Sequence, residues 1–155
     1  MPRQLNPAWV AAVRQLVDAC PYFQLQSLRL LDLTPGGSHL EIDLAQKHLQ
    51  PFGLVHGGVL ASLVDAAGFW AIYSQSEPPL GLTTVEMKLN FLAPAVRGRL
   101  CGRGRTIKLG RTLSLAEAQV TDEQGRLLSH GTVTLIGLES LSMWGQAELP
   151  AKFLD

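Results

Sequence analysis

Residues 59–73 constrain the fold more than any other part of this 155-residue chain. This stretch reads as a helix that is apolar nearly all round, with Asp65 as its only charged side chain. A helix without a polar face is stable when neighbouring elements cover it on all sides. The sequence therefore predicts a buried helix, and the rest of the chain must supply its cover.

The cover is predicted to be an antiparallel sheet. Loosely alternating apolar residues on either side of a Pro-Gly-Gly turn indicate an early hairpin over residues 25–44, and four further strand-like runs follow the helix. Turn residues separate these runs, as expected for antiparallel neighbours. We therefore expect an α+β fold in which a curved antiparallel sheet wraps around one long helix. The four runs cover residues 82–92, 98–108, 111–121 and 127–137.

The two ends of the chain are expected to pack around this core. Apolar residues at three- and four-residue spacings predict an amphipathic helix over residues 7–20 on the outside, with Asn6 as its cap and Pro7 in its first turn. The tail, residues 138–155, has no regular pattern but is apolar enough to dock. We predict one domain over residues 1–155, with its core at about 25–137.

Composition limits the partners of this domain. Lys plus Arg and Asp plus Glu both number 13, so no net charge attracts nucleic acid or a membrane surface. The chain is 46% apolar and 17% charged, which suggests that another subunit covers part of its surface. Arg14 and Asp18 interrupt the N-terminal apolar positions, so no signal peptide is expected, and we predict no membrane span. Cys20 and Cys101 lie in apolar segments, as reduced thiols of a cytoplasmic protein would.

Candidate functional groups lie on the central helix. Its start, His56-Gly57-Gly58, offers unpaired backbone N–H groups, the positive end of the helix dipole and close approach for a ligand. Burying the Asp65 carboxylate among apolar neighbours is costly, which favours a functional use. The alternative is that the glycines form a tight turn and that Asp65 is a satisfied interface residue. The combination of these features favours function.

The spacing of these groups predicts a shared site. Gly57 and Asp65 are eight residues apart, which is about 12 Å along one helix. A single carbonyl group cannot touch both. If both act on one substrate, Asp65 must come from a second copy of the helix, related to the first by a twofold axis.

Several segments resemble the hotdog-fold acyl-CoA thioesterases of the phenylacetate-degradation type. They are residues 56–65 with Gly53 before them, residues 83–87 and residues 90–95, and the resemblance extends over about 25–137. It implies hydrolysis of an acyl-CoA thioester, with Asp65 as nucleophile or general base and the Gly57 N–H polarising the thioester carbonyl. It also implies a homodimer, often paired into a homotetramer, and no cofactor beyond the coenzyme A of the substrate.

Other positions of the family carry over residue by residue. Gln50 stands where relatives commonly have an asparagine that positions the attacking water, and its side chain reaches further. Thr84 is suited to hold a water molecule or the carboxylate of Asp65. His56 would contact the thioester or, as we favour, cap and orient the turn. Gly58 would let the substrate approach the backbone.

Basic residues cluster between Glu86 and Glu117, where no acidic residue occurs. Any one of them could be an ordinary solvated charge, but for the group we expect phosphate contacts with coenzyme A. The residues chosen for that role are Arg103, Arg105 and Arg111, with Gly110 allowing close approach of the backbone.

No metal site is expected, because His39, His48 and His130 show no ligand spacing with each other or with cysteine. Two alternative functions stay open: an acyl-thioester dehydratase or hydratase on the same fold, and a non-catalytic acyl-CoA-binding module. The acyl group is not specified by the sequence. Candidate residues for an aromatic or medium-chain pocket are Phe52, Phe69, Trp70, Tyr73 and Phe91.

Overall fold

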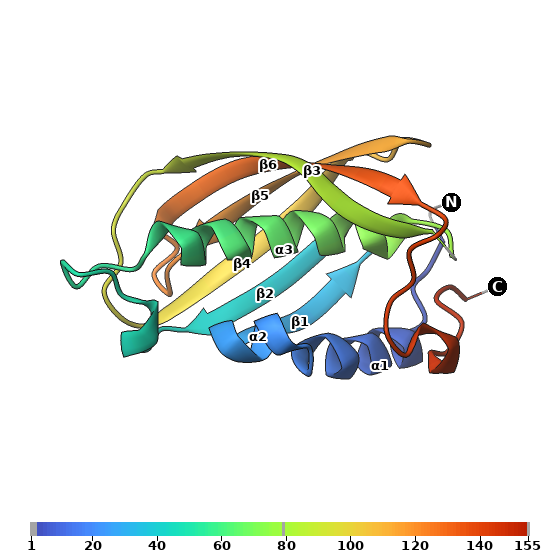
Figure 1. Cartoon of the computed structure of the whole chain (residues 1–155), viewed down its shortest axis with the longest axis horizontal. Helices are drawn as coiled ribbons and strands as arrows, with labels where there is room; N and C mark the ends of the chain where they lie inside the picture. The colour runs from blue at the N-terminus through green and yellow to red at the C-terminus, as the bar shows by residue number, and fades with distance from the viewer. Residues whose placement is uncertain (1–2, 79, 155) are drawn as a thin grey trace.

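The computed structural model describes residues 3–78 and 80–154. Within them a six-stranded sheet curves around one long helix, and two shorter helices lie outside the sheet near its first strand (Figure 1). Short 3₁₀ turns occur at Gln46–His48 and Gln146–Glu148. The elements are α1 (Pro7–Asp18), α2 (Pro21–Gln26), β1 (Leu28–Thr34), β2 (Gly37–Asp43), α3 (Gly57–Gln75), β3 (Gly81–Phe91), β4 (Arg99–Lys108), β5 (Leu113–Thr121) and β6 (Leu127–Leu138).

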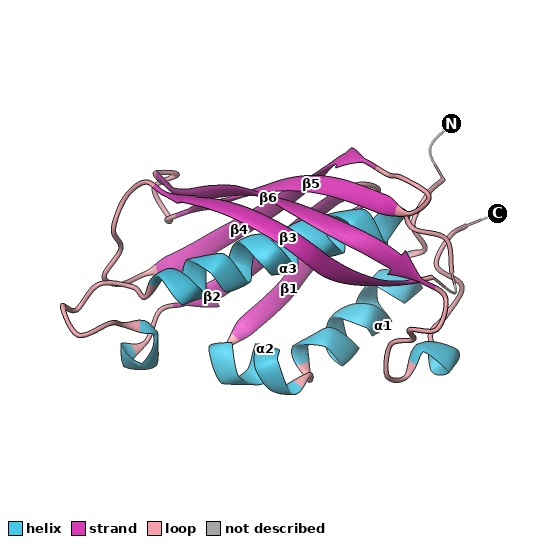
Figure 2. Cartoon of the chain, turned by 45° about the horizontal axis from the view of Figure 1, so that its top comes forward, coloured by secondary structure: helices cyan, strands magenta, loops and turns pink. Residues whose placement is uncertain are grey.

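The strands are ordered β1-β2-β4-β5-β6-β3, and every neighbouring pair is antiparallel. Helix α3 lies along the concave face, and both views show the sheet wrapped over it (Figures 1 and 2). This is the α+β hotdog arrangement that the sequence predicts. The four later strands agree with their predicted ranges to within two residues.

Helix α3 packs directly on the sheet because small residues face it. A Cβ atom on Gly104 of β4 would overlap the Ala67 carbonyl oxygen of α3, and one on Gly68 would lie 2.7 Å from Val133 of β6. Ser38 of β2 donates a hydrogen bond of 2.7 Å to the same Ala67 carbonyl. By length and composition α3 could cross a membrane. In this fold, however, it is the core helix.

The N-terminal segment differs from the prediction. Helix α1 ends at Asp18, two residues before the predicted end at residue 20. A second helix, α2, which was not predicted, begins at Pro21, because Cys20 has extended backbone angles before the proline. The hairpin also begins later than residue 25, because α2 continues to Gln26. Its C-cap, Ser27, has a left-handed backbone conformation with φ 54°, and β1 follows. Helix α1 packs against β1, as expected.

The C-terminal tail docks on the open end of the core (Figure 1). The side chain of Lys152 is buried and donates hydrogen bonds to the carbonyls of Tyr73 and Ser76, at the end of α3. Burial lowers the pKa of this amine to about 7. Phe153 is buried and bridges to Leu5. The tail therefore ties the end of α3 to the start of the chain.

Candidate active site

Asp65 lies in the middle of α3 on a half-buried face of the helix. One of its carboxylate oxygens, Oδ1, accepts a hydrogen bond of 2.8 Å from the Thr84 hydroxyl of β3. The pairing of β3 with β6 shifts register between Thr84 and Glu86, an irregularity of the kind that can redirect a side chain. Thr84 is thus in contact with the carboxylate, one of the two arrangements expected from the sequence.

The start of α3 is organised by His56. This residue is the N-cap, and its Nδ1 accepts a hydrogen bond of 2.8 Å from the Gly58 N–H. Because Nδ1 is the acceptor, the proton of a neutral imidazole lies on Nε2. The capping role favoured for His56 is therefore observed. The Gly58 N–H is used in this cap, and close approach of the substrate at Gly58 stays a prediction.

Gly57 is the first residue of α3, and its N–H has no hydrogen-bond partner within the described residues. A Cβ atom here would lie 3.3 Å from the Phe91 ring, so the glycine allows that ring to lie close to the helix start. Gln50 lines the same small cavity of about 340 Å³ as Gly57. The Gln50 side-chain oxygen accepts a hydrogen bond from the Phe52 N–H, which leaves its NH₂ group to donate.

The two halves of the predicted site are separate within one chain. Asp65 lines a cavity of about 860 Å³, whereas Gly57 and Gln50 line the smaller one, and none of the described residues lines both. This separation agrees with the distance predicted along the helix. One protomer therefore presents the carboxylate in one place and the free N–H in another.

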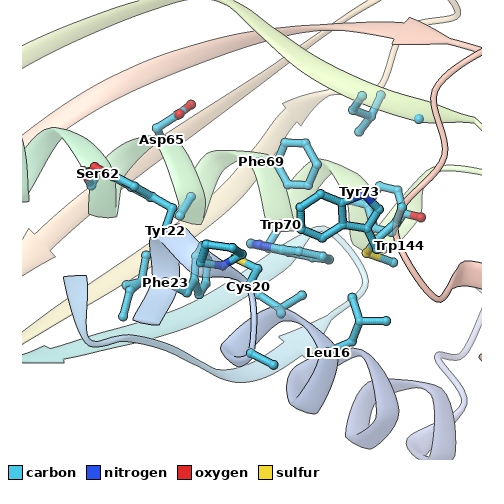
Figure 3. Close-up of a pocket in the computed structure, with 18 of the residues that line it drawn as sticks. Leu16, Cys20, Tyr22, Phe23, Ser62, Asp65, Phe69, Trp70, Tyr73 and Trp144 are labelled. Atoms are coloured by element: carbon cyan, nitrogen blue, oxygen red, sulfur yellow. Dashed lines mark hydrogen bonds between the residues drawn. The ribbon is translucent and has the colours of Figure 1, made fainter. Parts of the chain in front are cut away.

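The larger cavity is predominantly apolar, and its walls come from four parts of the chain: the segment of residues 16–28, α3, β3 and residues 141–144 (Figure 3). Phe69, Trp70 and Tyr73 line it from α3, as the sequence suggested, and their ring centroids are 5.2–5.8 Å apart. Phe91 lines the small cavity instead, and Phe52 is 90% exposed and lines neither cavity. Sequence reasoning did not identify the walls from the region around α2 and from residues 141–144, because no local pattern places them beside α3.

The basic residues chosen for phosphate binding lie away from both cavities. Along β4, Gly102 and Gly104 face α3. Because side chains alternate along a strand, the exposed Arg103 and Arg105 lie on the opposite face of the sheet, away from α3. Arg105 forms an ion pair of 2.6 Å with Glu117. The structure does not bring these arginines to Asp65 or Gly57 within one protomer, and phosphate binding stays a prediction.

Arg111 and Gly110 lie in the link between β4 and β5, where Arg111 is exposed. A side chain on Gly110 would overlap the Leu113 carbonyl oxygen, and the Gly110 N–H donates to the Ser114 hydroxyl at 3.1 Å. The close packing of this turn explains the need for glycine at position 110, and no bound ligand has to be invoked. Neither residue lines either cavity.

The sheet brings together one cluster that the sequence did not suggest. His39, Glu41 and Cys101 have possible ligand atoms within 4.8 Å of one another, because β2 pairs with β4 and places Glu41 opposite Cys101. The Glu41 carboxylate lies 3.4 Å from Arg99 and 3.6 Å from Arg29. Burial, followed by the Arg103 charge, lowers the pKa of His39. The cluster is best described as an ion-pair network.

Comparison with known proteins is consistent with this architecture. The family model described as the thioesterase superfamily matches residues 52–129. The crystal structure of a thioesterase family protein from Silicibacter pomeroyi is 32% identical, with a TM-score of 0.75, and the match covers 81% of this chain and 95% of that one.

Two curated relatives carry names that specify a reaction. The 1,4-dihydroxy-2-naphthoyl-CoA hydrolase of Listeria monocytogenes is 26% identical over 70% of this chain and 88% of its own length. Acyl-coenzyme A thioesterase 13 of Pongo abelii is 27% identical over 71% of this chain and 79% of its own length.

Proposed function

This chain belongs to the thioesterase superfamily and is a thioester hydrolase, and from that premise we propose that it hydrolyses acyl-CoA thioesters to a free acid and coenzyme A. The observation that carries the proposal is the Asp65 carboxylate, which is held by Thr84 beside a large apolar cavity. The two relatives named for CoA thioesters support coenzyme A as the leaving group. Such hydrolysis requires water and no further cofactor.

Asp65 would act in one of two ways. As a nucleophile, its free oxygen attacks the thioester carbon, the coenzyme A thiolate leaves, and water then hydrolyses the mixed anhydride. As a general base, the carboxylate removes a proton from the water molecule that attacks the thioester carbon, the C–S bond breaks, and coenzyme A leaves as a thiolate that takes up a proton. In both routes the hydrogen bond from Thr84 to Oδ1 holds the carboxylate and leaves Oδ2 to react.

The Gly57 N–H would stabilise the charge that develops on the thioester oxygen. It lies at the positive end of the α3 dipole, and its lack of a partner within the described part of the chain leaves it free to donate. Gln50, in the same cavity, would position the attacking water through its NH₂ group. His56 would hold the turn in shape by capping α3.

We propose that the working unit is a homodimer, further paired into a homotetramer. Support for the dimer comes from β3, which is an edge strand of the sheet and carries exposed apolar side chains. Val85, Met87 and Phe91 are 54%, 37% and 58% exposed. An unpaired apolar edge is a template for a second strand. Pairing of β3 with its copy about a twofold axis would bring the Gly57 end of one helix towards Asp65 of the other.

The test is release of free thiol from a panel of acyl-CoA thioesters by the purified protein and by Asp65→Asn. This substitution keeps the size of the side chain and removes its negative charge. We expect turnover by the native chain and a loss of at least about a hundredfold in kcat for the variant. Circular dichroism and gel filtration provide the control, because the variant should fold and assemble like the native chain. Native-like turnover by a folded Asp65→Asn would remove this residue from the mechanism.

The same preparation separates the two alternative functions. Hydration of an enoyl-CoA without thiol release would identify a hydratase. Binding of acyl-CoA with no reaction of either kind would identify a non-catalytic module. Both results would contradict the proposed hydrolysis.

A further inference from the structure

We infer that the large cavity beside Asp65 binds an unbranched medium-chain alkyl group, and that the N-terminal helices and residues 141–144 set the chain length. The inference rests on the proposed acyl-CoA hydrolysis and adds the class of acyl group. It concerns segments outside residues 52–129, the part of the chain that matches the family model.

The cavity extends along α3 from a polar end to an apolar one. Asp65 and Ser62 lie towards one side, and Leu16 and Trp144 towards the other (Figure 3). The Tyr22 and Ser62 hydroxyls are hydrogen-bonded to each other at 2.6 Å. The Ser62 hydroxyl donates to the Gly58 carbonyl at 2.8 Å, so within the pair Tyr22 donates and Ser62 accepts. Because both hydroxyl protons are engaged, most of the wall beyond Asp65 offers carbon surface to a ligand. Such a wall suits an apolar chain attached to a carbonyl group near Asp65.

The length of the cavity suggests the length of the chain. Asp65 and Tyr73 both line it, and eight residues of helix separate them by about 12 Å. An extended alkyl chain with C–C bonds of about 1.5 Å advances roughly 1.3 Å per carbon. The tail of an acyl group of about 8–10 carbons would therefore span the distance. The volume of about 860 Å³ leaves room for such a chain.

A single aromatic ring on the thioester carbonyl would fit less well. It would fill only the part of the cavity nearest Asp65 and leave the end at Leu16 and Trp144 without contacts. Each methylene group added to an alkyl chain buries further apolar surface, which corresponds to a gain of roughly three- to fourfold in affinity. An alkyl chain that reaches the far end gains these contacts.

The far wall is anchored on both sides. On one side Gly81 lets the Leu141 backbone pass, since a Cβ atom there would overlap the Leu141 carbonyl oxygen. On the other side Gly145 has φ 69°, and a Cβ atom on it would lie 2.7 Å from Leu16 of α1. Lys152 then binds the Ser76 carbonyl at 2.7 Å. Residues 141–144 are therefore held against α1 and can limit the length of a bound chain.

The test compares chain lengths on the native protein and on two variants that each replace a leucine with tryptophan. Leu16→Trp fills the far end of the cavity, whereas Leu109→Trp adds the same ring at a position that is 49% exposed and lines neither cavity. We expect kcat/KM of the native protein to rise from butyryl-CoA to a maximum at octanoyl- or decanoyl-CoA and to be lower for benzoyl-CoA. Leu16→Trp should lower the ratio of kcat/KM for decanoyl-CoA to that for butyryl-CoA by at least tenfold. Leu109→Trp should leave this ratio unchanged.

A binding measurement separates this inference from the proposed function. S-decyl-CoA and S-butyl-CoA are thioethers that cannot be hydrolysed, so their dissociation constants report the cavity even if no thioester is cleaved. Tighter binding of S-decyl-CoA, lost in Leu16→Trp, supports the inference. Should Leu16→Trp fail to fold, Trp144→Ala replaces it and should weaken S-decyl-CoA binding relative to S-butyl-CoA. Equal binding of the two thioethers, or a preference for benzoyl-CoA in turnover, would overturn it.

Discussion

Asp65 is half-buried on a helix whose other side chains are almost all apolar, and its one hydrogen bond within the described residues comes from Thr84. A carboxylate in such surroundings keeps a defined orientation because one oxygen is bound and the other is free. The proposed chemistry therefore depends on the hydroxyl of Thr84 as well as on the carboxylate. At the scale of single residues, Thr84 is a positioning residue.

Replacing Thr84 with valine preserves its shape and removes the hydroxyl. We expect kcat to fall by about tenfold or more, since a hydrogen bond to a charged group is lost. KM should change little, because Thr84 does not line either cavity. Thr84→Ser is the matched control and should retain most of the activity. Equal kcat values for Thr84→Val and the native chain would show that orientation by this hydroxyl is unimportant.

At the scale of elements, the closeness of α3 to β4 depends on the two small residues Gly102 and Gly104. A Cβ atom on Gly104 would meet the backbone carbonyl of Ala67, which cannot move without displacing the helix. A Cβ atom on Gly102 would lie 3.0 Å from the Leu63 Cδ2, the end of a flexible side chain. The two positions are alike in strand and in burial but differ in what they face.

This difference predicts unequal effects on stability. Gly104→Ala should lower the free energy of unfolding by about 2–3 kcal/mol, because helix and strand must separate. Gly102→Ala should lower it by about 1 kcal/mol or less, since the leucine can adjust. Urea denaturation of both variants measures the difference. Equal losses would mean that the helix can shift over β4 at little cost.

At the scale of the whole molecule, one chain holds Asp65 and Gly57 in separate cavities. If the proposed mechanism is correct, a complete site requires two chains. Two inactive chains with different lesions should then restore activity when they assemble together. The structure also suggests how to remove the Gly57 N–H with little distortion.

Gly57→Pro is suited to this experiment, because proline is favoured at the first position of a helix and His56 already has extended backbone angles. Mixed and refolded with Asp65→Asn, it should form heterodimers with both lesions in one site and the other site intact. With random assembly, half of the dimers would be heterodimers, and each would have one intact site. Activity divided by the total number of sites would therefore reach up to about a quarter of the native value. Gly57→Ala is the control: like proline it places a Cβ atom next to the Phe91 ring, but it keeps the backbone N–H. Inactive heterodimers, once their formation is verified, would contradict a shared site.

Much of the fold could be predicted from the order of residues because its signals are local. The apolar helix, the strand ranges and the choice of Asp65 depend on periodicity and composition within a few turns of chain. The helix begins at Gly57, within the His56-Gly57-Gly58 start that the sequence indicates and two residues before the apolar stretch 59–73, because the His56 side chain caps it. The short helix α2 was missed, although Pro21 is a signal for a helix start.

Features that depend on distant parts of the chain could not be predicted in this way. The cluster around Glu41 and the wall formed by residues 141–144 arise from strand register and from docking of the tail. The contact of Thr84 with the carboxylate also depends on strand register, and it was expected only from the family resemblance. Register and docking are set by packing between segments far apart in sequence, on which local periodicity has no influence. The exposed edge β3 likewise results from the strand order, which places β3 outside β6. Local patterns thus specify the elements and the carboxylate, and long-range packing specifies the cavity beside it.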